Sequence, residues 1–158
     1  ADQAYFDEKE AAIIVGNGGF LCPGYIDYDG GRRGFFAVVY GVPQGTIQRF
    51  TTLEFRPGSK LMVTVRKDGT CSYVKATASH VATEWVAVNL DGALEVNPIG
   101  RIAVGARFPV LTYHEGKRTG KFASVTDGFK VEYDVPQSDG SYACEVVRTG
   151  KRLFISIR

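Results

Sequence analysis

The sequence predicts an all-β fold, an antiparallel β-sandwich or barrel built from many short strands with little helix. Apolar and polar residues alternate over short stretches, glycine-containing turns separate these stretches, and helical periodicity is scarce. With 158 residues, the chain has the size of one domain and can bury a sizeable core without disulfides or metals. We therefore expect residues 1–158 to form a single β domain.

Alternation identifies the clearest strands. Residues 60–67, 129–135 and 153–157 each place apolar side chains at every second position, as in a strand with one buried face. Residues 34–40, with the sequence GFFAVVY, form a continuous apolar run that is typical of a more central strand. In the first of these strands, the residues expected on the buried face are Leu61, Val63 and Val65.

Turn signals separate the strands at short intervals. Asp-Gly and Pro-Gly pairs supply the positive-φ positions that tight hairpins require. The sequence KDGT at 67–70 is the strongest hairpin prediction. The glycine-rich stretch 16–19 invites a phosphate-loop interpretation, but Pro23 and Gly24 make a poor start for the helix that such a loop needs. We interpret it as a turn. The turn signals that separate the strands are Asp29-Gly30-Gly31, Pro57-Gly58, Asp68-Gly69, Asp91-Gly92, Asp127-Gly128 and Asp139-Gly140.

Composition excludes several classes of protein. The chain is 44% hydrophobic and 23% charged, as in ordinary globular proteins. It has no apolar run of membrane-spanning length, and its first residues lack the features of a secretion signal. Cys22, Cys71 and Cys144 are widely spaced and odd in number, which favours reduced thiols in a cytosolic folding compartment. No Cys or His pair has metal-ligand spacing, so we expect no metal and no cofactor.

Charge is distributed unevenly along the chain. Residues 1–30 carry a net charge of −5, and the rest therefore carries +7. This asymmetry favours electrostatic pairing within the fold or between copies, or it is a chance imbalance on a solvated surface. Two segments are the candidates for helix. Residues 7–14 could form two helical turns, but they are equally consistent with part of an extended arm. Residues 76–83 could hold a loop or one helical turn.

A small viral-type protease is the first enzyme to consider. His80 or His114 could act as the base, with Cys144 or Ser141 as nucleophile. The residues around Cys144 lack the glycines of an oxyanion-hole turn, and 142–147 reads as a strand interior. We therefore interpret Cys144 as a buried structural residue and assign no catalytic residue. A ligand-binding β-barrel is a further alternative.

The most polar segment, residues 113–121, holds candidate contact residues. Lys117, Arg118 and Lys121 could bind phosphate or an acidic protein surface, or they could belong to a solvated loop. The pI of about 8.5 is modest for a nucleic-acid-binding protein, so we expect no nucleic-acid partner.

Residues 142–157 combine a small residue and an acid in one strand, a turn glycine, and an alternating terminal strand. This layout resembles the closing hairpin of the decoration (cement) proteins that coat the heads of tailed bacteriophages. The stretches 56–61 and 104–108 resemble the glycine-then-strand units of the same proteins.

This resemblance implies a non-enzymatic virion protein that binds and stabilises a phage head lattice. Its expected partner is the major capsid protein, its copies often form trimers, and it would fold in the host cytoplasm. A structural protein of a phage tail or baseplate is the nearest alternative. Residues 1–10 would then be an extended arm, unless they form a frayed terminus. In that arm, Tyr5 and Phe6 would enter apolar pockets, while Asp7 and Glu8 would meet basic patches.

Overall fold

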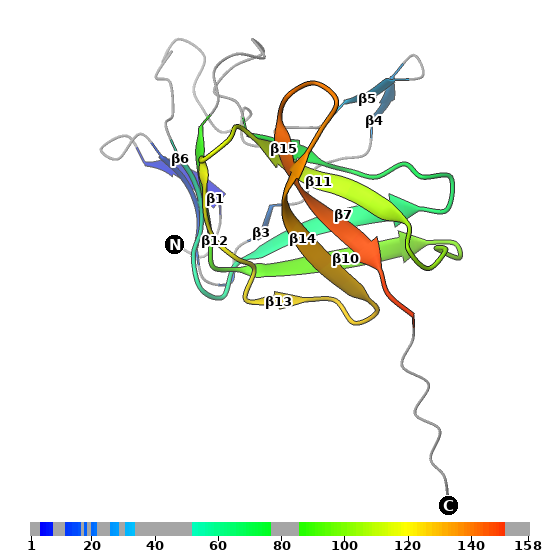
Figure 1. The fold of residues 1–158 in the computed structure, drawn as a ribbon. Helices are drawn as coiled ribbons and strands as arrows, with labels where there is room; N and C mark the ends of the chain where they lie inside the picture. Colours follow the sequence, from blue (N-terminus) through cyan, green and yellow to red (C-terminus); the bar gives the residue numbers. More distant parts are fainter. Residues whose placement is uncertain are drawn as a thin grey trace, which may run out of the picture.

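The computed structural model describes residues 4–7, 12–16, 18, 20–21, 26–28, 31–33, 52–76 and 86–150, which form β-strands joined by turns and contain no helix (Figure 1). The strands are β1 (Ala4–Asp7), β2 (Ala12–Val15), β3 (Phe20–Leu21), β4 (Ile26–Tyr28), β5 (Gly31–Arg33), β6 (Thr52–Phe55), β7 (Lys60–Arg66), β8 (Val74–Lys75), β9 (Ala87–Leu90), β10 (Ala93–Ile99), β11 (Arg107–Tyr113), β12 (Arg118–Gly120), β13 (Ser124–Val125), β14 (Phe129–Pro136) and β15 (Tyr142–Arg148).

The chain passes repeatedly through the same three sheets in the same order. We call each passage through these sheets a winding. The second winding runs through β6, β7 and β8, and the third runs through β9, β10 and β11. Each strand pairs in parallel with its counterpart, β6 with β9, β7 with β10, and β8 with β11. The first winding adds β2 and β3, and the fourth adds β12 and β13. The strand orders in the three sheets are β1-β2-β6-β9-β12, β13-β10-β7-β3 and β14-β15-β11-β8.

Backbone hydrogen bonds stack the corners at which successive windings leave the β6 sheet and enter the β7 sheet. The Ala93 amide donates to the Ser59 carbonyl at 2.8 Å, and the Ala123 amide donates to the Gly92 carbonyl at 2.8 Å. The first corner is joined to the second with the opposite polarity, because the Gly18 amide of the earlier winding donates to the Gly58 carbonyl of the later one at 3.0 Å. Gly18, in the glycine-rich stretch 16–19, therefore lies at a corner, in agreement with its interpretation as a turn.

One continuous core lies between the three sheets. Leu21, Leu61, Leu94 and Val125 occupy equivalent register positions in the four windings and form an aliphatic ladder. The three leucines are buried, and Val125 packs against them from the last winding. Stacking branched side chains of similar size fills the interior without large voids. The largest fully buried side chains are Tyr113, Phe55 and Phe108.

Antiparallel pairs occur where the windings end. In the fourth winding, β14 and β15 form a hairpin, and β15 inserts between β14 and β11, antiparallel to both. At the other end of the chain, β1 folds back antiparallel onto β2, and β4 and β5 form a separate hairpin. The β1 strand is thus one edge of the β6 sheet, and β12 is the opposite edge.

The prediction of an all-β fold is confirmed for the described residues, but the predicted antiparallel pairing is wrong for most of their strands. Seven of their strand pairings are parallel and four are antiparallel. A strand with one buried face alternates in the same way in either kind of sheet, so the periodicity did not distinguish them. The turns at 57–58 and 91–92 are corners between sheets and not hairpins.

Other turn and strand predictions have mixed outcomes. The 67–70 turn forms, with the Gly69 amide donating to the Arg66 carbonyl at 3.0 Å, but its flanks share only the bridge Val65–Cys71. The predicted strands at 60–67 and 129–135 are confirmed as β7 and β14. The predicted strands at 34–40 and 153–157 lie outside the described residues. Among the residues that the structure describes, no helix has the length and hydropathy to cross a membrane.

Candidate functional site

The predicted contact residues fall into two groups at opposite edges of the β6 sheet. Tyr5, Phe6 and Asp7 lie in β1, and Arg118 lies in β12, with Lys117 and Lys121 directly before and after that strand. Glu8 lies outside the described residues. The structure therefore brings the basic residues together at one edge and does not bring them near the acidic group, which is on the far edge.

Asp134 is the centre of a polar cluster formed by β11, β12, β14 and β15. It is the only non-glycine residue with positive φ, 55°, in the described part of the chain. It lies where the pairing of β14 with β15 shifts register between Glu132 and Val135. Aspartate tolerates this left-handed conformation better than most residues. Here the conformation lets the Asp134 amide donate to the Tyr113 hydroxyl at 2.9 Å.

Three further hydrogen bonds hold the Asp134 carboxylate. Tyr113 Oη donates to Oδ1 at 2.6 Å, and the guanidinium of Arg118 donates to Oδ1 at 2.9 Å and to Oδ2 at 2.8 Å. The same guanidinium lies 4.7 Å from the centre of the Tyr133 ring. Lys121 Nζ approaches that ring at 5.4 Å. Arg118, predicted as a contact residue, is therefore engaged within the fold.

The cluster stabilises charge states that do not suit proton transfer. Hydrogen bonding from Arg118 lowers the pKa of Asp134 to about 2, which makes its carboxylate a weak base at neutral pH. Burial raises the pKa of Tyr113 above its usual value. The arrangement acts as a cross-link between four strands. Sequence reasoning missed it, because Arg118 belongs to the polar segment 113–121 and Asp134 to the predicted strand 129–135, and nothing in the sequence indicates the bulge that brings them together.

The candidate nucleophiles of a protease, Cys144 and Ser141, are buried and hydrogen-bonded. Cys144 is fully buried in β15, its Sγ donates to Tyr113 Oη at 3.8 Å, and burial raises its pKa to about 12. The prediction that Cys144 is buried is confirmed. Ser141 is also buried, and its hydroxyl donates to Asp139 Oδ1 at 2.5 Å within a turn. His114 is exposed beside the turn before β12, and His80 lies outside the described residues.

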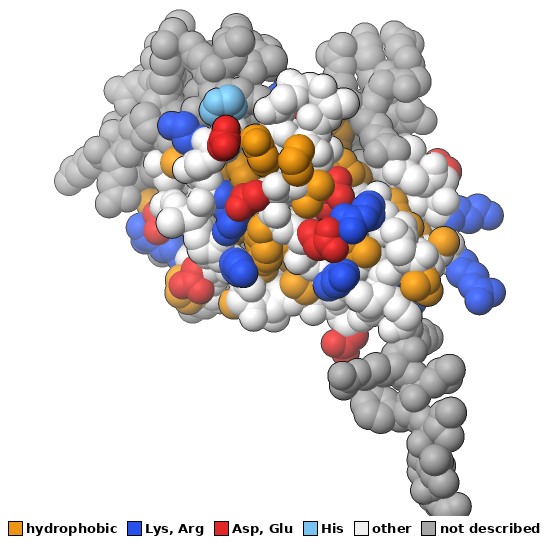
Figure 2. Space-filling model, in the orientation of Figure 1, with side chains coloured by type: hydrophobic (Ala, Val, Ile, Leu, Met, Phe, Trp, Pro, Cys, Tyr) orange, Lys and Arg blue, Asp and Glu red, His pale blue; other side chains and the backbone are white. Residues whose placement is uncertain are grey.

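A second polar group covers the outer face of the β11 sheet. Glu132 and Glu145 stand directly opposite each other in the paired strands β14 and β15, which alone would be repulsive. Arg107 Nη1 neutralises both, at 2.6 Å from Glu132 Oε2 and 3.0 Å from Glu145 Oε1. Acidic and basic side chains are accordingly interleaved on this face (Figure 2).

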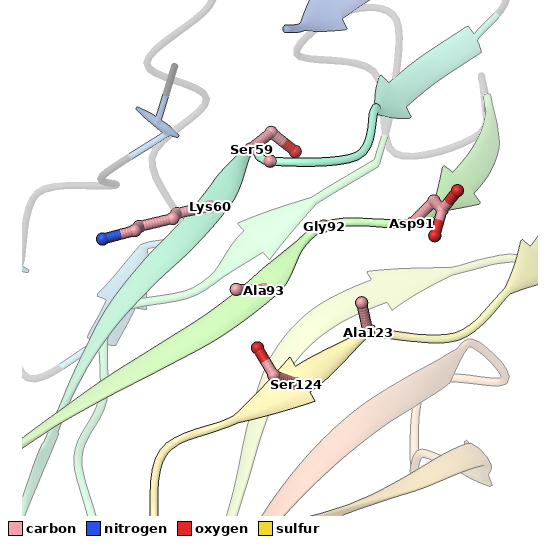
Figure 3. Close-up of a pocket in the computed structure, with 8 residues that line it drawn as sticks. Ser59, Lys60, Asp91, Gly92, Ala93, Ala123 and Ser124 are labelled. Carbon is pink, nitrogen blue, oxygen red and sulfur yellow. The ribbon is translucent and has the colours of Figure 1, made fainter. Parts of the chain in front are cut away.

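A hollow of about 230 Å³ lies at the stacked corners (Figure 3). Ser59 is almost fully buried there, and its Oγ has no hydrogen-bond partner in the described part of the protein. Figure 3 shows Lys60 and Asp91 on opposite sides of this corner. The volume is below the range of organic-ligand pockets, roughly 300–1,000 Å³. The lining residues are Gly58, Ser59, Lys60, Asp91, Gly92, Ala93, Ala123 and Ser124.

A second hollow, of about 410 Å³, lies at the corner between β10 and β11. We call this corner the tip and define it as residues 98–104 together with Lys67 and Arg148. Val104 is 71% exposed and Ile99 is 46% exposed; among the large apolar side chains that the structure describes, Phe20 is the other exposed one. The residues that line the hollow are Pro98, Gly100, Arg101, Ile102, Val104 and Arg148, with two arginines and no acid among them.

The basic residues of the tip contrast with those at β12. Neither Arg101 nor Arg148 forms an ion pair with a carboxylate of the described residues. Arg148 Nη1 donates to the Gly128 carbonyl at 2.9 Å, while its buried Nε has no hydrogen-bond partner among those residues. Lys67 adds a third cation, because its side chain lies alongside Gly100. Positively charged side chains project from this edge, on the right of Figure 2, with hydrophobic side chains beside them.

Compared with known protein families and with characterised proteins, the sequence matches none. Sequence reasoning missed the tip as a site. The segment 98–106, PIGRIAVGA, contains three large apolar residues, of which Ile99 and Val104 are exposed and Ile102 is buried. The sequence offers no signal that separates the exposed residues from the buried one.

Proposed function

We propose that the protein is a structural protein, without enzymatic activity, that assembles with copies of itself on a larger lattice. The observation that carries this proposal is the tip, where Ile99 and Val104 are exposed beside three cations. Exposed apolar residues clustered with polar ones are typical of protein-contact surfaces. The engagement of Asp134, Arg118 and Cys144 in cross-strand hydrogen bonds supports a structural role for those groups.

More narrowly, we propose a virion protein that decorates the head of a tailed bacteriophage and binds its major capsid protein. The support is the resemblance of 142–157, 56–61 and 104–108 to decoration proteins. Of these stretches, 104–108 overlaps the tip. A structural protein of the phage tail or baseplate is the second candidate, since it would use the same kind of contact surface.

We also infer that the architecture is a short parallel β-solenoid, in place of the sandwich or barrel predicted from the sequence. The support is the repeated order of the three sheets in the second and third windings and the stacked corners. In such a fold each winding contacts mainly its neighbours, and loops project from the corners. Projecting corner loops would present the tip to a partner.

Light scattering on a size-exclusion column tests the assembly proposal. We expect the purified protein to form a discrete oligomer whose mass is a small multiple of 17.2 kDa. A strict monomer at the highest soluble concentration would contradict self-assembly and favour the ligand-binding alternative. The head-decoration proposal predicts that the protein sediments with expanded empty phage heads that lack their decoration protein, and that Val104→Asp abolishes this. Failure to sediment with heads or with tails would overturn the virion assignment.

A further inference from the structure

The tip combines an apolar surface with positive charge that is not neutralised within the described part of the chain. Its hollow has a volume of about 410 Å³, with Arg101 and Arg148 in its lining and Val104 71% exposed at its rim. By contrast, Arg118 at the β12 edge is paired with Asp134. An occupant of the tip should therefore carry carboxylates together with an apolar or aromatic side chain.

The N-terminal segment of the chain has this composition. Residues 1–10 hold four acids and one lysine, a net charge of −3, with Tyr5 and Phe6 among the acids. The other terminal segment, 151–158, has the wrong charge, because it contains Lys151, Arg152 and Arg158 and no acid. The stretch 131–140 is equally acidic, but its Glu132 and Asp134 are already paired with arginines of the fold. Of the two terminal segments, the acidic one therefore complements the tip.

The position of β1 makes this pairing intermolecular. β1 is the edge strand of the β6 sheet, and Figure 1 shows it on the left of the molecule, while the β10–β11 corner lies on the right. β1 is therefore remote from the hollow of its own copy. It can reach the hollow of a neighbouring copy that is placed side by side in the same orientation.

We infer that the tip hollow receives the acidic N-terminal segment of a second copy, in a head-to-tail contact. The carboxylates of Asp7, Glu8 and Glu10 would pair with Arg101, Arg148 and Lys67, and an aromatic side chain would cover Val104. Such a heterologous contact closes into a ring where the rotation between copies permits, and otherwise extends as a filament. This inference rests on the proposed assembly function and names the partner surface within it.

Charge-reversal variants and their mixture test the contact by sedimentation velocity over a range of concentrations. Arg101→Glu on the tip and the double variant Glu8→Lys with Glu10→Lys on the segment should each weaken self-association about tenfold or more, because each juxtaposes like charges. Mixing the two variants should restore association, since the acid introduced on the tip then faces the two lysines introduced on the segment. Val104→Asp should weaken it as well. Lys117→Glu is the matched control, because it makes the same charge change at the β12 edge and should leave association unchanged.

The outcomes separate the inference from the proposed function. If the wild type forms oligomers that Arg101→Glu and Val104→Asp leave intact, the tip is not the contact, although the assembly proposal survives. Loss of oligomers in Lys117→Glu alone would move the contact to the β12 edge and overturn the inference in the same way. A wild type that stays monomeric, with no association in the mixture, overturns both self-assembly and this contact.

Discussion

The stacked corners make a sharp prediction for Gly92→Ala. A Cβ at Gly92 would lie 2.3 Å from Ser59 Oγ, 2.8 Å from the Ser59 carbonyl oxygen and 3.2 Å from its carbon. Rotation of the Ser59 side chain would relieve the first contact but not the two with the backbone. The corner of one winding must therefore move away from the next, which disturbs the hydrogen bond from Ala93 to Ser59.

The expected loss in the free energy of unfolding of Gly92→Ala follows from overpacking, which typically destabilises proteins by about 1–3 kcal/mol. Because two of the three contacts at Gly92 involve backbone, we expect the upper part of this range, about 2–3 kcal/mol. For a domain of this size, that corresponds to a fall in Tm of roughly 5–10 °C. Urea unfolding followed by circular dichroism measures the free energy of unfolding, and thermal melting checks the shift.

Two glycine variants serve as controls. A Cβ at Gly150 would have no neighbour within 4 Å, and the backbone there is not left-handed, so Gly150→Ala should be nearly neutral. Gly105 also has open space but a φ of +86°, so Gly105→Ala reports the backbone effect alone, about 1–2 kcal/mol. If Gly92→Ala were as stable as Gly150→Ala, the windings would not be stacked at this corner, and the parallel arrangement would be refuted there.

Three other predictions concern the core and the Asp134 cluster. Leu94→Ala removes the middle of the aliphatic ladder and should cost about 2–5 kcal/mol in urea unfolding, whereas a cost below about 1 kcal/mol would contradict its burial between Leu61 and Val125. The pKa of Asp134 is lowered from 3.8 to about 2, so its stabilisation is complete above pH 4 and is lost as pH falls toward 2; after allowance for its exposure, we expect about 1 kcal/mol, absent in Asp134→Asn. The pKa of Cys144 is raised to about 12, so the thiol should resist iodoacetamide at pH 8 until the protein unfolds, and peptide mapping that finds rapid labelling of native Cys144 would disprove its burial.

Sequence reasoning identified the strands better than it identified which strands pair with one another and in which direction. The alternation in β7 predicted which of its side chains are buried, since Leu61, Val63 and Val65 are all inside. Pairing direction depends on where the chain goes after each turn, and glycine has positive φ in hairpins and in corners alike. Gly140 closes a hairpin and Gly58 forms a corner, with φ of 86° and 80°. Local conformation at the turn therefore did not decide the topology.

The repeat of windings was hidden for a physical reason. The corner between the first two sheets consists of residues 56–59 in the second winding, 91–92 in the third and 121–123 in the fourth. Because backbone groups make the corner hydrogen bonds, the length of each corner can differ, and side-chain identity is restricted only where a Cβ would clash, as at Gly92. Buried positions stay apolar from one winding to the next, as in the pairs Leu53–Val88 and Val63–Val96, but apolar residues at irregular intervals are too weak a signal for a repeat.

The candidate site could not be found by looking for charged segments alone, because the folded structure determines which charged side chains are paired with one another. Arg118 belongs to the most polar segment of the sequence, yet Asp134 neutralises it through two hydrogen bonds. Arg101 stands in a less polar stretch, and no carboxylate of the described residues neutralises it. A partner gains little by approaching a charge that is already paired, since it must break the existing pair first. The tip, where Val104 is exposed beside arginines that no described carboxylate neutralises, is therefore a surface at which the acidic segment of a second copy can form new ion pairs without breaking existing ones.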